Sequence, residues 1–579
     1  MRSWFKYVKP YKHAFILGPL CMIAEVIGEV LMPYLLSVII NRATDGSLTV
    51  GGSLGVMALM ILSAVLMMAG GIGGAYFGAK ASIGFSSDLR LDVYKKIQSF
   101  SFMNVDKFST ASLVTRTTND ITQMQNFINM ILRMGLRSPG MMIGALVMAV
   151  SIKPNLSLVF AVILPIMIVV IIFLLFAAFP RFNIMQKKID KLNSTVRESV
   201  TNVRVVKSFV REDFEEEKFK ESNRDLKKAG MSASKLMILM QPVMSIFMNG
   251  AIIAVVWFGQ KEVLAGGMEV GDLSAFLTYV TQILFSLIMV TVLLVMSARA
   301  IASAKRIKEV LNEQPDITDD TEKELLTEIE RGDIEFKNVS FRYYKHSPDK
   351  VLDNINIKIK RGATVGIIGS TGCGKTTLVS LIPRLYDADE GEILIDGKNV
   401  RDYTLHTLRE SIGMVLQKNV LFSGTIEENL RWGNQNATDE ELVAAAKSAE
   451  ADKFISTFSD GYDTMLDQSG KNVSGGQKQR LCIARALLKK PKIIILDDST
   501  SAVDTATEAA IRESFRNDLK DTTKIIIAQR ISSVIDADEI IVMNEGKVTG
   551  IGTHDELMAG NEEYREIYYS QNDKKAGDK

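Results

Sequence analysis

The N-terminal half of the chain contains six apolar runs that are each long enough to cross a bilayer, and the C-terminal half contains none. A membrane-spanning helix needs about 20 predominantly apolar residues. The runs lie at 14–40, 54–79, 132–152, 156–178, 237–258 and 273–299. Since 579 residues also exceed what one hydrophobic core organises, the sequence predicts a helical membrane domain followed by a separate soluble domain.

The connections between the apolar runs alternate between short and long. Residues 41–53, 153–155 and 259–272 are short and poor in Lys and Arg, whereas 80–131 and 181–236 are long, basic and low in helix breakers. The positive-inside rule therefore assigns the long connections and both chain ends to the cytoplasm. We expect each long connection to form a helical hairpin that reaches roughly 35 Å from the bilayer.

Changes in composition set the expected domain boundaries. The segment after the last apolar run is polar and acidic and contains Pro315, which is typical of a linker. From Asp333 the apolar period changes to two, which indicates a strand. The expected parts are a transmembrane domain at 1–311, a linker at 312–330, an α/β nucleotide-binding domain at 331–570 and a polar tail at 571–579.

Charge and cysteine content exclude several classes of function. The net charge is +1, so nothing favours nucleic acid as a partner. Cys21, Cys373 and Cys482 have no paired spacing, which argues against a disulfide framework and against a metal site. Cys373 lies within a glycine-rich loop, where we interpret it as a small filler residue, with a redox switch as the alternative.

That glycine-rich loop follows a buried-strand pattern at 364–368 and precedes a helical pattern that begins at Lys375. A strand, loop and helix in this order are the context that a phosphate-binding loop requires. The residues expected to bind nucleotide here are Gly369, Ser370, Thr371, Gly372, Cys373, Gly374, Lys375, Thr376 and Thr377. We expect the backbone N–H groups to surround phosphate oxygens, Lys375 to reach the outer phosphates and Thr376 to ligate Mg²⁺.

A second apolar strand, 493–496, ends at Asp497. An acidic residue in this place is the expected Mg²⁺ partner of a phosphate-binding loop. ATP and Mg²⁺ are therefore the predicted cofactors.

With these motifs, with Val473-Ser474-Gly475-Gly476-Gln477 about a hundred residues beyond the loop, and with six spans before them, the chain resembles an ABC exporter half-transporter over nearly its whole length. The run from Val473 matches the ABC signature, which in that family caps ATP held by the opposing domain. The resemblance further assigns nucleotide contacts to Tyr343, Ser474, Gly475, Gly476, Gln477 and Asp504. It implies that Tyr343 stacks on adenine, that Gln417 ligates Mg²⁺ and takes part in catalysis, and that Asp504 of the D-loop 501–504 crosses between two sites.

The same resemblance assigns two regions to the coupling between domains. Asp106 to Asp120, with Phe108, Arg116 and Asn119, resembles the first coupling-helix region. Val206 to Phe214 resembles the second.

Three positions depart from the family pattern. Asp498 stands where the family has a catalytic glutamate, Gln529 where it has a switch histidine, and Val473 where it has leucine. Asp498 is one methylene short for a base that must reach the attacking water, and an amide carries no proton at neutral pH. We therefore expect this chain to bind ATP but hydrolyse it poorly at its own site, with Asp498, Gln529 and Gln417 as the catalytic set.

The resemblance and the departures together favour a heterodimer with a second ABC half-transporter that supplies the glutamate and the histidine, as in bacterial multidrug exporters. The expected substrate is an amphipathic small molecule, and the expected location is the cell inner (plasma) membrane. A homodimeric lipid or peptide exporter and a regulatory ATP-binding subunit are the alternatives.

Two acidic residues stand within the first apolar run. Glu25 and Glu29 are one helical turn apart, and ionisable groups inside a bilayer usually face a cavity or a partner. The sequence leaves open whether they bind a cationic substrate, relay protons or only support the structure. Methionines are abundant in the spans, where packing is their more frequent role and adaptable substrate contact the alternative.

Overall fold

The computed structural model describes residues 2–47, 49–319, 324–344, 348–499 and 503–576. Contacts within the chain divide it into two compact units. The helical unit comprises Met1–Ile97 and Ala111–Asn312, and the C-terminal unit comprises Gln98–Thr110 and Glu313–Lys579. A short segment from the first long connection thus groups with the C-terminal unit, whereas the sequence placed that whole connection in the transmembrane domain.

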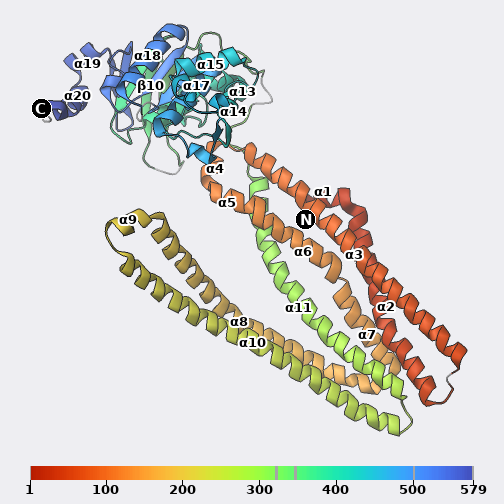
Figure 1. Cartoon of the computed structure of the whole chain (residues 1–579). Coiled ribbons are helices and arrows are strands. Elements are labelled where there is room, and N and C mark those ends of the chain that lie inside the picture. The colour runs from red at the N-terminus through yellow and green to blue at the C-terminus, as the bar shows by residue number, and fades with distance from the viewer. Residues whose placement is uncertain (1, 48, 320–323, 345–347, 500–502, 577–579) are drawn as a thin grey trace. The chain divides into compact units, whose positions relative to one another are not determined.

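Among the described residues, the helical unit has six helical stretches long and apolar enough to span a membrane, which confirms the predicted number (Figure 1). They are Trp4–Thr44, Val50–Gln98, Thr110–Ile152, Pro154–Thr201, Glu212–Leu264 and Val270–Asn312. At 1.5 Å per residue, the 49 residues of Val50–Gln98 extend about 74 Å, more than twice the roughly 30 Å hydrocarbon core of a bilayer. Helices of this length continue well beyond the membrane.

The helices of this unit are joined by short turns and distortions. Their bounds are α1 Arg2–Val8, α2 Lys12–Thr44, α3 Val50–Gln98, α5 Thr110–Thr115, α6 Ile121–Met134, α7 Arg137–Ile152, α8 Pro154–Thr201, α9 Val203–Ser208, α10 Glu212–Leu264 and α11 Val270–Asn312. One turn of π-helix, Arg116–Asp120, joins α5 to α6. The long helices α8 and α10 run side by side with α9 at their tip, so the second long connection is a helical hairpin (Figure 1).

Aromatic side chains and close backbone approach hold the helical unit together. The Tyr279 hydroxyl of α11 donates to the Val30 carbonyl of α2 at 2.8 Å, and the rings of Phe160 and Phe276 stack at 5.5 Å. A Cβ added at Gly70 of α3 would lie 2.6 Å from the Cys21 carbonyl oxygen. Since small residues let membrane helices approach closely, Gly70 has a packing role.

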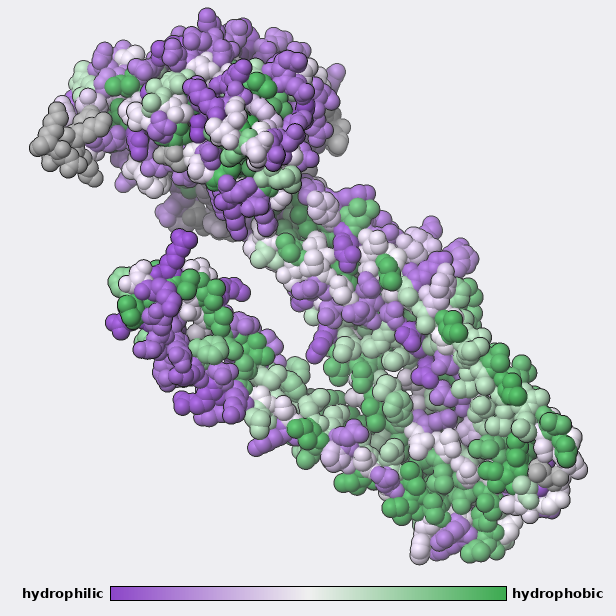
Figure 2. Space-filling model, viewed as in Figure 1, coloured by the Kyte–Doolittle hydropathy of each residue, from purple (hydrophilic) through white to green (hydrophobic). Residues whose placement is uncertain are grey.

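Much of the surface of the helical unit is apolar (Figure 2). Phe173 and Phe176 of α8, for example, are 69% and 77% exposed. A soluble monomer rarely exposes contiguous apolar patches of more than a few hundred Å². This surface is therefore suited to contact with lipid, whereas hydrophilic residues are frequent along the hairpin of α8 and α10 in the same view.

A six-stranded sheet forms the centre of the C-terminal unit, in the order β12-β11-β3-β10-β9-β6. All neighbours pair in parallel except β11 and β12. The bounds are β3 Thr364–Gly369, β6 Ile412–Val415, β9 Ile493–Asp497, β10 Thr523–Ile527, β11 Glu539–Asn544 and β12 Lys547–Gly552. Because β3, β9 and β10 are parallel neighbours, the residues that follow them meet at one edge of the sheet.

A four-stranded sheet, in the order β2-β1-β4-β5, packs beside it with antiparallel pairing. Its bounds are β1 Ile334–Phe341, β2 Leu352–Ile359, β4 Glu390–Ile395 and β5 Lys398–Asn399, and a small sheet pairs β7 Gly424–Thr425 with β8 Met465–Leu466. The strand expected from Asp333 is thus β1. This arrangement of a helical membrane domain before an α/β domain confirms the predicted fold class.

Helices complete the C-terminal unit. They are α4 Phe102–Phe108, α12 Lys375–Leu381, α13 Leu405–Glu410, α14 Ile426–Arg431, α15 Asp439–Ser448, α16 Asp452–Ile455, α17 Gly475–Leu488, α18 Thr505–Asp518, α19 His554–Gly560 and α20 Glu562–Ala576. Helix α20 includes the first residues of the segment that the sequence suggested was a polar tail. That segment is therefore helical through Ala576.

Candidate functional site

The glycine-rich loop joins the last residue of β3 to the first residue of α12. Gly372 and Gly374 have φ of 88° and 98°, a left-handed region that glycine adopts without a steric penalty. A Cβ at Gly372 would meet nothing within 4 Å, whereas one at Gly369 would lie 2.1 Å from the Met543 carbonyl oxygen. The loop therefore packs closely on β11 at its start and is open at its turn, as phosphate binding requires.

Lys375 folds back over this loop. Its ammonium donates to the carbonyl oxygens of Gly369 at 2.7 Å and Ser370 at 2.8 Å. Cys373 is 4% exposed, belongs to the hydrophobic core between the two sheets, and lies 3.7 Å from the Lys375 ammonium. Its burial among apolar side chains supports the role of a filler residue.

Thr376 and Asp497 form a polar pair at the carboxyl ends of β3 and β9. The Thr376 hydroxyl donates to Asp497 Oδ1 at 3.1 Å. Asp497 is 1% exposed, and its Oδ2 has no hydrogen-bond partner among the described residues. Burial raises the pKa of the Asp497 carboxyl, and the Thr376 hydrogen bond opposes that rise. A buried carboxylate oxygen without a partner, next to a hydroxyl, fits the hard oxygen ligands that Mg²⁺ prefers.

The three residues predicted to act in catalysis come together at one carboxylate. The Gln529 side-chain amide donates to Asp498 Oδ2 at 2.7 Å, and Gln417 also hydrogen-bonds to Asp498. Burial raises the pKa of Asp498, and both glutamine hydrogen bonds lower it. Asp498 has φ of 48°, a region where Asp is far commoner than most residues. Two of the three departures from the family pattern, Asp498 and Gln529, are therefore in direct contact.

Gln571 of α20 is a further polar residue at this corner. Its amide nitrogen donates to the Gln529 carbonyl at 2.8 Å, and its amide oxygen accepts from the Ile531 backbone N–H at 3.0 Å. The two bonds bracket Arg530 and hold the segment that carries Gln529. No sequence pattern predicts this contact, because Gln571 lies 42 residues away in a polar stretch without a motif.

Tyr343, the predicted adenine contact, lies beside the helix that follows the phosphate-binding loop. Its hydroxyl shares a hydrogen bond with the Thr377 hydroxyl at 2.9 Å. Its ring packs edge-on against Phe341 at 5.0 Å and Tyr386 at 5.2 Å. The neighbouring Tyr344 is 78% exposed.

Tyr386 also contacts α4, the segment from the first long connection. Its hydroxyl donates to Asp106 Oδ2 at 3.2 Å, and its ring lies 6.0 Å from that of Phe102. Arg116, predicted within the same coupling region, instead pairs with Glu309 of α11 at 3.0 Å in the helical unit. The expected region 106–120 therefore divides between the two units, at Thr110 and Ala111.

The signature residues form the first turn of α17. Ser474 caps this 14-residue helix, since its hydroxyl accepts from the Gln477 N–H at 3.3 Å. The Gln477 side chain in turn accepts from the Ser474 N–H at 2.9 Å. This capping box fixes the first turn, with Ser474 and Gly475 exposed. The helix N-terminus carries the partial positive charge that favours phosphate.

Asp504 caps α18 by accepting from the Thr507 N–H at 2.9 Å and its hydroxyl at 2.7 Å. These hydrogen bonds lower the pKa of Asp504. Ser501 and Ala502, the preceding D-loop residues, lie outside the described residues. A contact of Asp504 across two sites remains a prediction.

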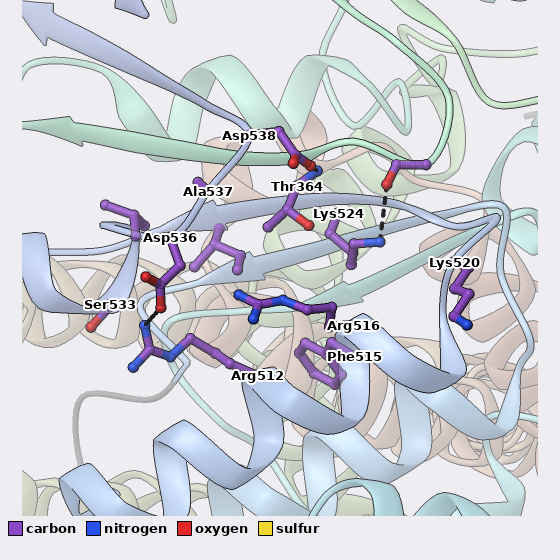
Figure 3. A pocket seen from close by; sticks show the side chains of 13 residues that line it. Thr364, Arg512, Phe515, Arg516, Lys520, Lys524, Ser533, Asp536, Ala537 and Asp538 are labelled. Atoms are coloured by element: carbon purple, nitrogen blue, oxygen red, sulfur yellow. Dashed lines mark hydrogen bonds and ion pairs between the residues drawn. The ribbon is translucent and has the colours of Figure 1, made fainter. Parts of the chain in front are cut away.

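A hollow of about 270 Å³ in the C-terminal unit lies at the amino ends of the parallel strands, beside Thr364 (Figure 3). Arg512 and Asp536 approach each other to 3.6 Å there. The Lys524 ammonium donates to three backbone carbonyls, and burial lowers its pKa. Ligands of parallel α/β sheets bind at the carboxyl ends of the strands. The nucleotide site is thus the one built by the loop after Gly369.

Comparisons with known proteins agree with this geometry. Family models match residues 15–287 as an ABC transporter transmembrane region and residues 352–501 as an ABC transporter. The ABC transporter ATP-binding protein YfiB of Bacillus subtilis (strain 168) is 38% identical over 99% of this chain and 98% of its own. YknU of the same organism is 35% identical over 97% and 96%. A solved bacterial Atm1-family ABC exporter with ATP bound has a TM-score of 0.79 and 25% identity, covering 97% of this chain and 98% of that one.

The chain therefore belongs to the ABC transporter family. It is an exporter half-transporter with a transmembrane domain and one nucleotide-binding domain. It is a multi-pass membrane protein, and its nucleotide-binding domain hydrolyses ATP to drive transport.

Proposed function

We propose that this chain is one half of a heterodimeric exporter, and that its own Walker site hydrolyses ATP slowly while its signature serves the site of the partner. The observation that carries this proposal is the 2.7 Å hydrogen bond from the Gln529 amide to the Asp498 carboxylate. This bond occupies one oxygen of the group that would activate water. A base must lie within hydrogen-bond reach of the proton it removes, and an error of about 1 Å costs on the order of 10²-fold in rate.

The protonation chemistry of the site supports the same assignment. Imidazole can accept and release a proton near neutral pH. The amide of Gln529 can donate and accept hydrogen bonds but cannot take up a proton at this pH. Gln417 also hydrogen-bonds to Asp498. The carboxylate is thus held by two amides and is short by one methylene, so proton removal from water is slow.

The geometry around the phosphate-binding loop, in contrast, supports ATP binding. The backbone N–H groups of the loop from Ser370 to Gly374 and the Lys375 ammonium would hold the phosphates. Thr376 and Asp497 would hold Mg²⁺, which neutralises phosphate charge when bound. Tight binding with slow turnover is the combination expected of a site that stays closed while the partner site cycles.

The partner site would use the N-terminal turn of α17. Ser474, Gly475 and Gln477 form a regular, solvent-facing helix start, so they can cap the γ-phosphate of ATP held by another nucleotide-binding domain. The partner half would supply the glutamate and the histidine that this chain lacks. The substrate would be an amphipathic small molecule that leaves the cell.

The orientation in the membrane follows from charge. The extramembrane parts of the long helices are rich in Lys and Arg, as in the hairpin around α9. The positive-inside rule therefore places this hairpin, both termini and the nucleotide-binding domain in the cytoplasm of a plasma-membrane protein.

Phosphate release by the purified full-length chain, alone and mixed with a half-transporter that carries the glutamate and the histidine, tests this proposal. We expect the mixture to turn over ATP at least about tenfold faster per nucleotide site than the chain alone. Equally fast hydrolysis in both samples would favour the homodimeric exporter. Normal ATP binding with equally slow hydrolysis in both samples would favour the regulatory subunit.

A further inference from the structure

A cavity of about 300 Å³ opens among the helices of the transmembrane domain. Glu29 of α2, Arg137 of α7, and Gln282 and Phe285 of α11 line it, and Met248 of α10 lies on its wall. These residues come from four helices that are far apart in the sequence. The cavity lies wholly within the helical unit, so its geometry does not depend on the C-terminal unit.

A charged triad lies at one side of this cavity. Arg137 approaches Glu29 Oε2 with Nη2 at 3.0 Å and Glu25 Oε1 with Nε at 3.3 Å. Two carboxylates and one guanidinium leave a formal charge of −1 when all three groups are ionised. Ionisable groups within membrane helices are costly and usually mark a pathway or a partner. The Arg137 guanidinium forms ion pairs with both carboxylates, although its buried Nε makes no hydrogen bond among the described residues. The net charge of the triad is therefore negative.

Gln282 adds an acceptor that nothing in the described chain satisfies. Its amide nitrogen donates to the Glu29 carbonyl at 3.2 Å, which orients the side chain. Its amide oxygen is buried and has no hydrogen-bond partner among the described residues. A buried acceptor without a donor destabilises the structure that holds it. The group that completes this site is therefore a hydrogen-bond donor.

The remaining wall is apolar and deformable. Met141, Met248 and Met289 line it together with Phe285. Thioether side chains adapt to ligands of different shape, and an aromatic face attracts cations. The cavity thus combines a polar side of net negative charge with an apolar side.

We propose that this cavity binds the transported molecule, and that the molecule is a small monocation with a protonated amine and an apolar body. The amine N–H groups would donate to Glu29 and to the Gln282 amide oxygen, and the apolar body would lie against the methionines and Phe285. The inference rests on the proposed export of an amphipathic small molecule and names its charge. An anion is disfavoured because Arg137, the cation of the triad, already pairs with both carboxylates.

Three probes with one apolar body and different head groups test this assignment: 4-phenylbutylamine, 4-phenylbutanol and 4-phenylbutyrate. Binding to the full-length chain in lipid nanodiscs is measured by calorimetry. We expect the amine to bind at least about tenfold more tightly than the other two probes, which corresponds to about 1.4 kcal/mol. Glu29→Gln should abolish this preference, and Gln282→Met should weaken binding of the amine by about threefold.

Glu262→Gln is the matched control, because Glu262 also pairs with a basic residue, Lys153 at 2.7 Å, but does not line the cavity. It should leave amine binding unchanged. Equal binding of the amine and the alcohol, tighter binding of the butyrate, or an equal loss in Glu262→Gln would overturn the assignment. Partner-dependent ATP turnover without any probe is a separate measurement, so failure here leaves the proposed heterodimer intact.

Discussion

The two nucleotide-contacting surfaces of the C-terminal domain differ in how closely they follow the family pattern. On the Walker side, the positions of the base and of the switch residue carry Asp498 and Gln529, which bond to each other. On the signature side, Ser474 and Gln477 form a complete capping box at the start of α17. In the assembly that we propose, each nucleotide site combines the Walker side of one chain with the signature of the other, so the two surfaces would belong to different sites. One chain can therefore lose hydrolysis at its own site and still support it at another.

The largest expected effect comes from a substitution in the signature. Ser474→Ala in the mixed complex should lower ATP turnover by about 100-fold, because it removes a donor to phosphate and the cap of α17. Phosphate release measures the effect. Thr438→Ala is the control, since Thr438 forms the same capping box at α15. If both variants lost the same activity, the loss would reflect helix capping alone.

A gain of ATPase activity should follow from restoring the family residues on the Walker side. Asp498→Glu combined with Gln529→His should raise the turnover of the chain alone by roughly 30-fold, because the longer carboxylate reaches the water and imidazole carries a proton. Each single change should give less, since Gln529 still holds the carboxylate in one and Asp498 is still short in the other. No gain in the double variant would show that the two substitutions do not limit turnover.

The sequence was sufficient for the parts of the site that depend on local order. The phosphate-binding loop, Asp497 and the signature are each contiguous with the strand or helix that positions them, so their spacing predicted their place. Partners that meet only through folding were missed. Arg137 pairs with Glu29 across 108 residues, and Gln571 reaches Gln529 from a stretch without apolar periodicity or a motif.

The coupling region shows the same limit on a finer scale. Its position in the first long connection followed from the resemblance to the family. Its division between Thr110 and Ala111, with Asp106 against Tyr386 and Arg116 against Glu309, depends on contacts between distant segments that no residue pattern predicts. The six spans were predictable because apolar length alone determines them.

A change in the free energy of unfolding should show that Asp497, the carboxylate proposed to bind Mg²⁺, is buried as an unpaired charge. Asp497→Asn should stabilise the metal-free, nucleotide-free chain at pH 7 by roughly 1–2 kcal/mol, because it removes a buried charge with an unpaired oxygen. A carboxyl whose folded pKa is raised destabilises the fold once pH exceeds its unfolded value, so the advantage should shrink as pH falls through that raised pKa. Thermal unfolding in EDTA at several pH values measures it, and a pH-independent gain would contradict this origin.

The smallest expected effect concerns the support of the switch segment. In the Asp498→Glu, Gln529→His background, Gln571→Ala should lower turnover by about threefold, because it frees the backbone on both sides of Arg530. Ser570→Ala is the control, as its hydroxyl bonds only within α20, to Ile567. Phosphate release compares the two. Equal rates for both variants would remove Gln571 from the positioning of this segment.

The asymmetry is tested most directly by Asp498→Asn in the mixed complex, with the corresponding glutamate-to-glutamine change in the partner measured beside it. If the carboxylate of this chain contributes little to hydrolysis, Asp498→Asn should leave steady-state phosphate release within about twofold, while the change in the partner should lower it by about 100-fold or more. A collapse of turnover in Asp498→Asn would contradict the asymmetry and make this chain a catalytic half in its own right.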